Sequence, residues 1–195
     1  LLTKIIPIIF LIGVCLVFLY KFILKGLLPL PLDIITGMYY PWLNHKWGNA
    51  VGVAVKNHFI SDSVSQFWIW RNWAVNLLKQ GKIGIWNPHS LAGYPLSPWF
   101  HTMIFSPINL VYFVFSEPMS MAIVVVSQLF VGLIGMYLMT KKIIGNQFSA
   151  VLSSILFVFS SFFIGWLTWG TVSWTLAFLP WILYFLEGNQ DLGVF

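Results

Sequence analysis

Charged residues are scarce in this chain. Among 195 residues there are ten Lys and Arg and five Asp and Glu, so charged residues make up only 8% of the sequence. A soluble domain contains about 25%. With 59% hydrophobic residues and a mean hydropathy of +0.86, the chain lacks the polar side chains that a fully water-facing surface needs. The composition therefore predicts an integral membrane protein.

Several common chemical signatures are also missing. The single cysteine, Cys15, excludes an intramolecular disulfide and a cysteine-based metal site. Neither a glycine-rich nucleotide-binding loop nor a zinc-protease motif occurs in the sequence. The formal net charge of +5 comes from basic residues that never form a run of five, so nucleic acid is not an expected partner. We expect these residues to contact lipid headgroups and to set the membrane topology.

The chain does contain long apolar segments that suit a helical fold. Helices crossing a bilayer need about 20 apolar residues, and the predicted spans are 5–24, 119–140, 148–166 and 172–187. For the first segment a signal peptide is the competing interpretation, although no small-x-small cleavage site follows it. The sequence therefore predicts an all-α polytopic membrane protein with one long loop over residues 25–118.

The long loop is predicted to lie outside the cytoplasm and to carry two helices on the membrane surface. Lys141 and Lys142 follow a predicted span and favour the cytoplasmic side, which places the loop outside. Apolar residues recur at helical spacing over 62–80, but several polar residues there disfavour a span. Residues 103–115 are apolar but short. Both segments are predicted to be amphipathic juxtamembrane helices.

Two carboxylates in this loop are candidate catalytic residues. Asp62 begins the predicted surface helix, where it could act as a general base toward an acceptor hydroxyl or hold a divalent cation against a phosphate. The alternative is a plain helix cap, worth about 1 kcal/mol. Asp33, which follows Pro31 near the exit of the first span, is the second candidate. Its alternative is a turn residue.

Further loop residues are candidates for substrate binding. Gln66 lies one turn after Asp62 and could orient the same ligand. Arg71, the only arginine, suits a phosphate, although a side chain snorkelling at the interface is the competing interpretation. Trp86, Asn87 and His89 lie on a proline-rich segment and could wall a pocket or simply pack the loop.

The order of these motifs resembles the bacterial YfhO family of polytopic membrane proteins. Asp62-x-x-x-Gln66 is followed by Trp86-Asn-Pro-x-Ser-x-x-Gly93-x-Pro95-Leu, and then by Phe105-x-Pro107-x-Asn109-Leu and Gly135-Met-Tyr-Leu. The resemblance covers roughly residues 61–187. The loop before Asp62 is longer than the family pattern suggests, and Asp33 competes for the role of first acidic residue.

The resemblance implies a glycosyltransferase of the GT-C class in the bacterial cytoplasmic membrane. Such enzymes transfer a sugar from a polyprenyl-phosphate donor to an acceptor on the outer face, here an envelope glycan or lipid. It implies a catalytic or metal-linked role for Asp62, with Mg²⁺ or Mn²⁺ as the possible cofactor. A transporter or lipid-handling protein, and a structural envelope protein, are the alternative functions.

The predicted organisation is one membrane domain over residues 1–195. Because the chain starts at Leu1 without Met and stops soon after the last predicted span, we expect it to be the N-terminal part of a longer protein. The sequence leaves the sugar, the acceptor and the oligomeric state open.

Overall fold

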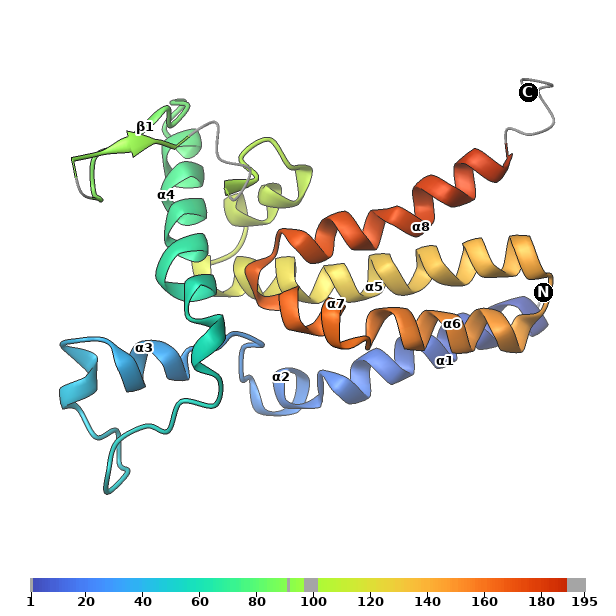
Figure 1. Ribbon diagram of the computed structural model, residues 1–195, viewed down its shortest axis with the longest axis horizontal. Coiled ribbons are helices and arrows are strands. Elements are labelled where there is room, and N and C mark those ends of the chain that lie inside the picture. The colour runs from blue at the N-terminus through green and yellow to red at the C-terminus, as the bar shows by residue number, and fades with distance from the viewer. Residues whose placement is uncertain (1, 91, 97–101, 189–195) are drawn as a thin grey trace. The chain divides into compact units, whose positions relative to one another are not determined.

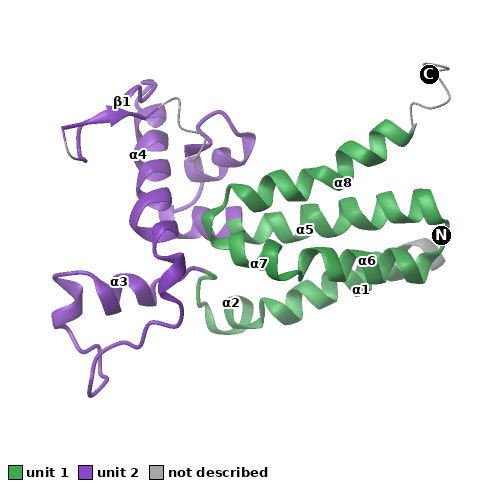
Figure 2. Ribbon diagram, in the orientation of Figure 1, with its two compact units in different colours: residues 1–29, 125–195 green, residues 30–124 purple. Residues whose placement is uncertain are grey.

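The computed structural model describes residues 2–90, 92–96 and 102–188, and these are mostly helical, which confirms the predicted all-α class. The chain divides into two compact units (Figure 2). Unit 1 comprises Leu1–Pro29 and Val125–Phe195, and unit 2 comprises Leu30–Val124. The boundary falls inside helix α5 (Glu117–Ile144), which begins in unit 2 and continues into unit 1.

Unit 1 is built only from helices in its described part (Figure 1). Its elements besides α5 are α1 (Leu2–Phe18), α2 (Tyr20–Lys25), α6 (Gln147–Val158), α7 (Ser161–Trp166), the 3₁₀ turn η6 (Leu167–Trp169) and α8 (Val172–Gly188). Helix α1 packs along α6, and α7 packs on α8. The rings of Phe18 and Phe159 meet edge to face with centroids 5.2 Å apart.

The helices of unit 1 follow the predicted spans with two interruptions. Within the described residues one helix, α5, is long and apolar enough to cross a membrane by itself. The predicted 148–166 span is instead two helices bent by 41° at a short break. The break arises because Ser160 has an extended backbone and its Oγ accepts the Phe163 amide proton, which starts a new helix. The predicted 5–24 span is likewise divided, at Leu19.

Large apolar side chains point outward on α6, while small ones face the interior. Ala150, Ser154 and Val158 are buried at successive helical turns, whereas Phe148, Leu152 and Leu156 are exposed. The buried Ser154 hydroxyl donates a hydrogen bond to the Ala150 carbonyl oxygen at 2.6 Å. A helix of a water-soluble bundle has the opposite arrangement.

Helix α8 has the same inverted pattern. Ser173 and Ala177 are fully buried, and the Ser173 hydroxyl donates to the Phe163 carbonyl oxygen at 2.9 Å. Six large apolar side chains of this helix are exposed, namely Phe178, Leu179, Ile182, Leu183, Phe185 and Leu186. In water such a continuous apolar surface would favour aggregation or association.

Gly135 on α5 allows the close approach of α8. A Cβ at Gly135 would lie 2.5 Å from the indole of Trp181, whose Nε1 donates to the Val131 carbonyl oxygen at 2.9 Å. We expect Gly135→Ala to lower the free energy of unfolding by about 1–3 kcal/mol, since the indole must shift from its hydrogen bond. Thermal unfolding in detergent measures this change.

Gly13→Ala is the matched control for that measurement. Gly13 lies inside α1, and a Cβ there would meet no atom within 4 Å. Its replacement should leave stability unchanged or raise it by about 0.5–1 kcal/mol through helix propensity. Equal melting temperatures for both variants would show that the α5–α8 contact is not tight.

Unit 2 combines short helices with a small hairpin. Its elements are α3 (Asp33–Met38), η1 (Trp42–Asn44), η2 (His58–Ile60), the π-helix η3 (Ser63–Phe67), α4 (Trp68–Lys79), strands β1 (Trp86–Asn87) and β2 (Tyr94–Pro95), and the 3₁₀ helix η5 (Pro107–Phe113). The strands are antiparallel, with Trp86 opposite Pro95 and Asn87 opposite Tyr94. Ala74, Leu96 and Ile104 form a buried core against the partly buried Trp70, Trp73 and Leu78.

The two helices predicted in the long loop are present with different details. The 62–80 segment is helical, as η3 followed directly by α4. The 103–115 segment is a 3₁₀ helix confined to Pro107–Phe113. Pro107 sits at its first turn, where its missing amide proton is tolerated, and Asn109 Nδ2 donates to the Met103 carbonyl oxygen at 2.6 Å. These two residues fix where the helix begins.

Candidate functional site

The helix that carries Asp62 begins with a π-helical turn. Ser63 Oγ donates to the Ile60 carbonyl oxygen at 2.7 Å, and Ser65 Oγ donates to the Ser61 carbonyl oxygen at 2.9 Å. These serine hydroxyls bond to carbonyls of the preceding turn, which helps to accommodate the wider π turn. The helix becomes regular at Trp68.

Asp62 and Gln66 form a side-chain pair on this turn. Gln66 Nε2 donates to Asp62 Oδ1 at 3.1 Å, and Asp62 is exposed. Within the described residues the Asp62 side chain makes no capping hydrogen bond, because its backbone is already helical. The cap considered as the alternative from sequence is therefore not formed. The carboxylate is oriented by Gln66 and remains accessible to a ligand.

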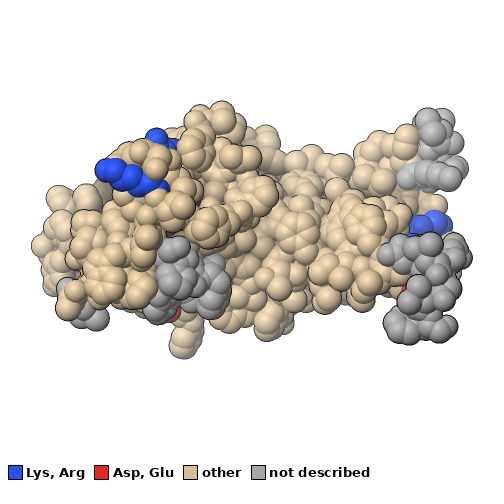
Figure 3. Space-filling view, turned by 90° about the horizontal axis from the view of Figure 1, so that it is seen from above, with Lys and Arg blue, Asp and Glu red and all other residues tan. Residues whose placement is uncertain are grey.

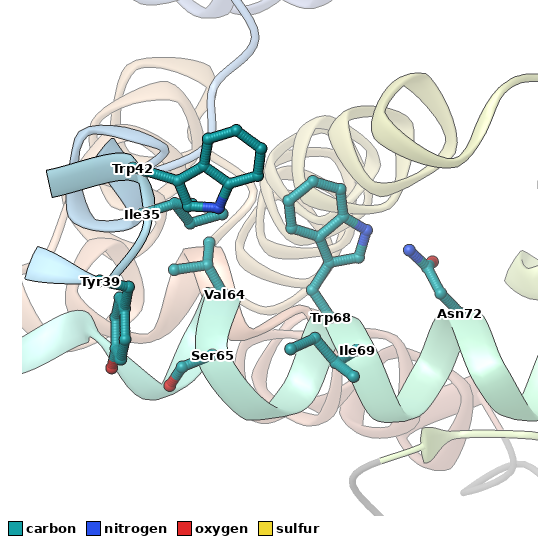
Figure 4. Close-up of a pocket in the computed structure, with 8 residues that line it drawn as sticks. All are labelled: Ile35, Tyr39, Trp42, Val64, Ser65, Trp68, Ile69 and Asn72. Carbon is teal, nitrogen blue, oxygen red and sulfur yellow. The ribbon is translucent and has the colours of Figure 1, made fainter. Parts of the chain in front are cut away.

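A pocket of about 420 Å³ opens beside the same helix. Figure 4 shows its lining, which comes from α3, η1, η3, α4 and the residue after α3: Ile35, Tyr39, Trp42, Val64, Ser65, Trp68, Ile69 and Asn72. Three of these side chains are aromatic and none is charged. Ser65 precedes Gln66 in the π turn, so the pocket wall and the Asp62–Gln66 pair belong to the same helical segment, although neither Asp62 nor Gln66 is among the lining residues.

Two polar groups of the pocket wall are buried without a partner. Within the described part of the chain, neither Trp68 Nε1 nor Asn72 Oδ1 has a hydrogen-bond partner. The indole nitrogen of Trp68 lies on the side of its ring that faces Asn72 (Figure 4). Both atoms are enclosed by protein, one helical turn apart, beside the pocket.

Glu117 holds the Asn72 amide in place. Asn72 Nδ2 donates to Glu117 Oε2 at 3.1 Å, and Asn76 Nδ2 donates to Glu117 Oε1 at 2.7 Å. A carboxylate can only accept hydrogen bonds, so the nitrogen of each amide must face Glu117. The orientation of the Asn72 oxygen is therefore fixed by α5.

Arg71 is buried behind this surface. Its side chain is 1% exposed, Nη1 donates to Met121 Sδ at 3.7 Å, and Tyr112 Oη donates to the same sulfur at 3.5 Å. Burial lowers the pKa of the Arg71 guanidinium from its ordinary value, and burial likewise raises the pKa of Tyr112. Because the guanidinium is enclosed, neither the predicted phosphate contact nor interfacial snorkelling fits this conformation.

Trp86, Asn87 and His89 belong to the hairpin and do not line the pocket. Asn87 is buried, and its Oδ1 accepts the His89 amide proton at 2.9 Å, which forms a local turn. The His89 ring meets Trp73 edge to face at 5.3 Å. Their observed contacts are those of loop packing, the alternative interpretation from sequence.

Asp33 forms a hydrogen bond with the backbone of the loop that precedes Asp62. Its Oδ2 accepts the Lys56 backbone amide proton at 2.9 Å. We expect Asp33→Ala to release the segment around Lys56, so trypsin should cleave after Lys56 several times faster than in the unaltered protein. Limited proteolysis with mass spectrometry measures this, and Asp33→Asn, whose oxygen still accepts, is the control. Equal cleavage rates in all three proteins would contradict the anchoring role.

Three residues of this region were not predicted from sequence, namely Trp68, Asn72 and Glu117. Nothing in the sequence distinguishes Trp68 from the other ten tryptophans, or Asn72 from the other polar residues of the predicted surface helix. The spacing of Trp68 and Asn72 by four residues was visible. Glu117 is 45 residues from Asn72 in the chain, and no local pattern connects the two.

No protein family, curated protein or solved structure matches this chain. The resemblance to YfhO proteins therefore stays a prediction. Within the described residues no group of three or more His, Cys, Asp or Glu side chains could hold a metal ion.

Proposed function

We propose that this chain is part of a membrane glycosyltransferase of the GT-C class. It would transfer a sugar from a polyprenyl-phosphate donor to an envelope glycan or lipid. The observation that carries the proposal is the Asp62 carboxylate, which is exposed, is oriented by Gln66 and does not serve as a helix cap. Such a group can accept a proton from an acceptor hydroxyl. The motif order around Asp62 and Gln66 supports the same class.

The proposed location is the bacterial cytoplasmic membrane, with unit 2 on the outer face. Helix α5 has no charged residue between Glu117 and Lys141, and α6 and α8 turn their large apolar side chains outward. The molecular face in Figure 3 carries few charged side chains. Lipid solvates such surfaces, whereas water does not. Lys141 and Lys142 after the apolar part of α5 favour the cytoplasmic end.

A divalent cation, Mg²⁺ or Mn²⁺, remains part of this proposal with Asp62 as its protein ligand. The side-chain oxygens that this pair could present to a cation are Asp62 Oδ2 and Gln66 Oε1. Magnesium is commonly held by one or two carboxylates, with substrate phosphates and water completing its octahedron. The pair fits that pattern, and a bound cation would supply charge neutralisation for the phosphate of the donor.

The full-length protein in proteoliposomes tests the proposed function. Polyprenyl-phosphate donors carrying radiolabelled sugars are supplied with membrane glycolipid acceptors, and labelled product is separated by chromatography. We expect label to move from donor to acceptor. Label that crosses the bilayer on unchanged donor would instead indicate a transporter. A transport site would depend on a polar residue in the middle of a span, and Gln128 is such a residue of α5. Its side chain is buried and donates to the Leu167 carbonyl oxygen at 3.1 Å.

A further inference from the structure

We propose that the pocket of unit 2 holds one acyl chain of an anionic phospholipid, whose headgroup lies near Lys46, just after the η1 wall. This lipid is neither the donor nor the acceptor of the transferase reaction. The proposal therefore goes beyond the function given above and rests only on the membrane location. It assigns a ligand class to the pocket and the choice of headgroup to the segment around Lys46.

The polar atoms in the pocket wall offer a guest few hydrogen bonds. The Ser65 hydroxyl already donates to the Ser61 carbonyl oxygen at 2.9 Å, and the Asn72 amide nitrogen donates to Glu117 at 3.1 Å. Trp68 Nε1 and Asn72 Oδ1 are enclosed by protein. Because none of the lining residues is charged, a polar guest would lose its water for little return. The pocket is therefore suited to an apolar guest.

The walls present aromatic faces and branched aliphatic groups to such a guest. The six apolar lining residues are Ile35, Tyr39, Trp42, Val64, Trp68 and Ile69. Trp42 and Trp68 reach the pocket from different elements, η1 and α4 (Figure 4). The C–H groups of a hydrocarbon chain can pack on such rings without strict geometry. The volume of about 420 Å³ lies within the usual range for small-molecule sites, about 300–1,000 Å³.

The driving force for filling the pocket comes from its walls. An acyl chain inside a bilayer is already in an apolar medium, so it gains little by entering another one. The apolar surface of the pocket, however, leaves water when a chain covers it. A chain is therefore favoured where the pocket opens at the boundary between membrane and water.

The segment beside the pocket mouth has the composition of such a boundary. Tyr39 and Trp42 are exposed wall residues, and His45, Lys46 and Trp47 follow them on the surface. Trp47 Nε1 donates to the Trp42 carbonyl oxygen at 3.1 Å, and the two indole rings have centroids 6.4 Å apart. These contacts hold the turn that carries Lys46 against a pocket wall. Aromatic residues beside basic ones are typical of the headgroup region.

The charges of this segment favour an anionic headgroup. Between residues 34 and 61 the charged side chains are Lys46 and Lys56, both exposed, and no Asp or Glu occurs. Asp33, which precedes the segment, directs its Oδ2 to the Lys56 backbone amide. One lysine near an anionic membrane surface improves binding about fivefold. We therefore expect phosphatidylglycerol to be preferred over zwitterionic phosphatidylcholine by about that factor.

Photocrosslinking of the full chain, with one copy in each phospholipid nanodisc, tests the proposal. The probes are phosphatidylglycerol and phosphatidylcholine that carry a diazirine in the middle of one acyl chain, and mass spectrometry maps the adducts. We expect adducts on Tyr39, Trp42 or Ile69, displaced by unlabelled phosphatidylglycerol at about fivefold lower concentration than by phosphatidylcholine. Adducts on the exposed face of α8 report ordinary bilayer contact and should show no such preference.

Matched variants separate the pocket from the rest of the surface. Ile69 and Ile83 are both 56% exposed and both lie in unit 2, but only Ile69 lines the pocket. Ile69→Glu should reduce the adducts on Trp42 about tenfold, because a carboxylate in the wall must lose water when a chain enters, whereas Ile83→Glu should change them less than about twofold. Ile69→Trp fills the mouth with apolar volume and should also reduce them, without adding a charge.

A second pair of variants tests the headgroup. Lys46→Glu should abolish the preference for phosphatidylglycerol in the pocket adducts while leaving adducts on α8 unchanged. Lys82→Glu makes the same charge change at another exposed position of unit 2 and should alter the preference less than about twofold. Equal displacement by both lipids in the unaltered protein would overturn the assignment of an anionic phospholipid.

The remaining outcomes concern the occupant. Adducts on α8 without adducts on the pocket wall would overturn the proposal, as would equal pocket adducts in both Ile69 variants and Ile83→Glu. Polyprenyl phosphate that displaces the pocket adducts at lower concentration than phosphatidylglycerol would assign the pocket to a donor lipid instead. Pocket adducts that vanish when two copies share a nanodisc would assign it to a second copy. None of these results affects sugar transfer that depends on Asp62, which is measured separately.

Discussion

Asp62→Asn is expected to reduce sugar transfer by the full-length protein at least about a hundredfold. A general base contributes about 10²–10⁴ to a rate, and an amide cannot take the proton. The change alters little else, since the Asn oxygen can still accept from Gln66 and the native carboxylate is exposed and caps no helix. Initial transfer rates in proteoliposomes, with melting temperatures measured beside them, test this expectation.

Two further variants test whether the loss of rate is specific to the Asp62 carboxylate. Asp62→Glu keeps a carboxylate but displaces it by one methylene, so we expect a partial loss of rate, between the unaltered protein and Asp62→Asn. Gln80→Ala, an exposed position at the end of α4, should transfer at a rate within about twofold of the unaltered protein. Full activity in Asp62→Asn would remove the catalytic role of this residue.

Arg71→Ala is expected to lower the free energy of unfolding by about 3–5 kcal/mol. The side chain is among the largest fully buried ones, so its removal leaves a cavity beside Met121 and takes away the group that interacts with Tyr112. Chemical or thermal unfolding in detergent, followed by tryptophan fluorescence, measures the loss.

Arg71→Met distinguishes packing from charge in the same measurement. Methionine restores most of the volume without a charge, and replacing a buried ion by an apolar side chain of similar size is often neutral or stabilising. We therefore expect Arg71→Met to be far more stable than Arg71→Ala. Lys79→Ala, an exposed residue whose ammonium lies 6.0 Å from the Phe113 ring, should cost less than about 1 kcal/mol. Similar losses in both Arg71 variants would show that the charge itself stabilises unit 2.

The helices could be predicted from sequence where a pattern of neighbouring residues specifies them. The 62–80 and 119–140 segments have long, consistent patterns, and both are helical in the structure. The division of the 148–166 segment was not expected, because its apolar pattern continues across Ser160. A serine there can remain helical or cap the next helix, and packing against neighbouring helices decides between these states.

For the candidate site, the pairing of Asp62 with Gln66 follows from a spacing of four residues. The sequence also identified Arg71 as exceptional, but the character of its surroundings depends on Tyr112 and Met121, which the chain brings back from 41 and 50 positions away. Whether an arginine faces a ligand or a core is set by such contacts. The sequence composition contains no information about them.

The sequence by itself determined that this chain is helical, poor in charge and rich in apolar surface, because composition and helical periodicity are properties of neighbouring residues. Only the tertiary structure decided that Trp68 and Asn72 line a pocket and that Glu117 orients one of them. The pocket depends on packing against residues 35–42, and the orientation of Asn72 depends on Glu117, 45 positions along the chain. At such separations no periodic pattern in the chain carries information.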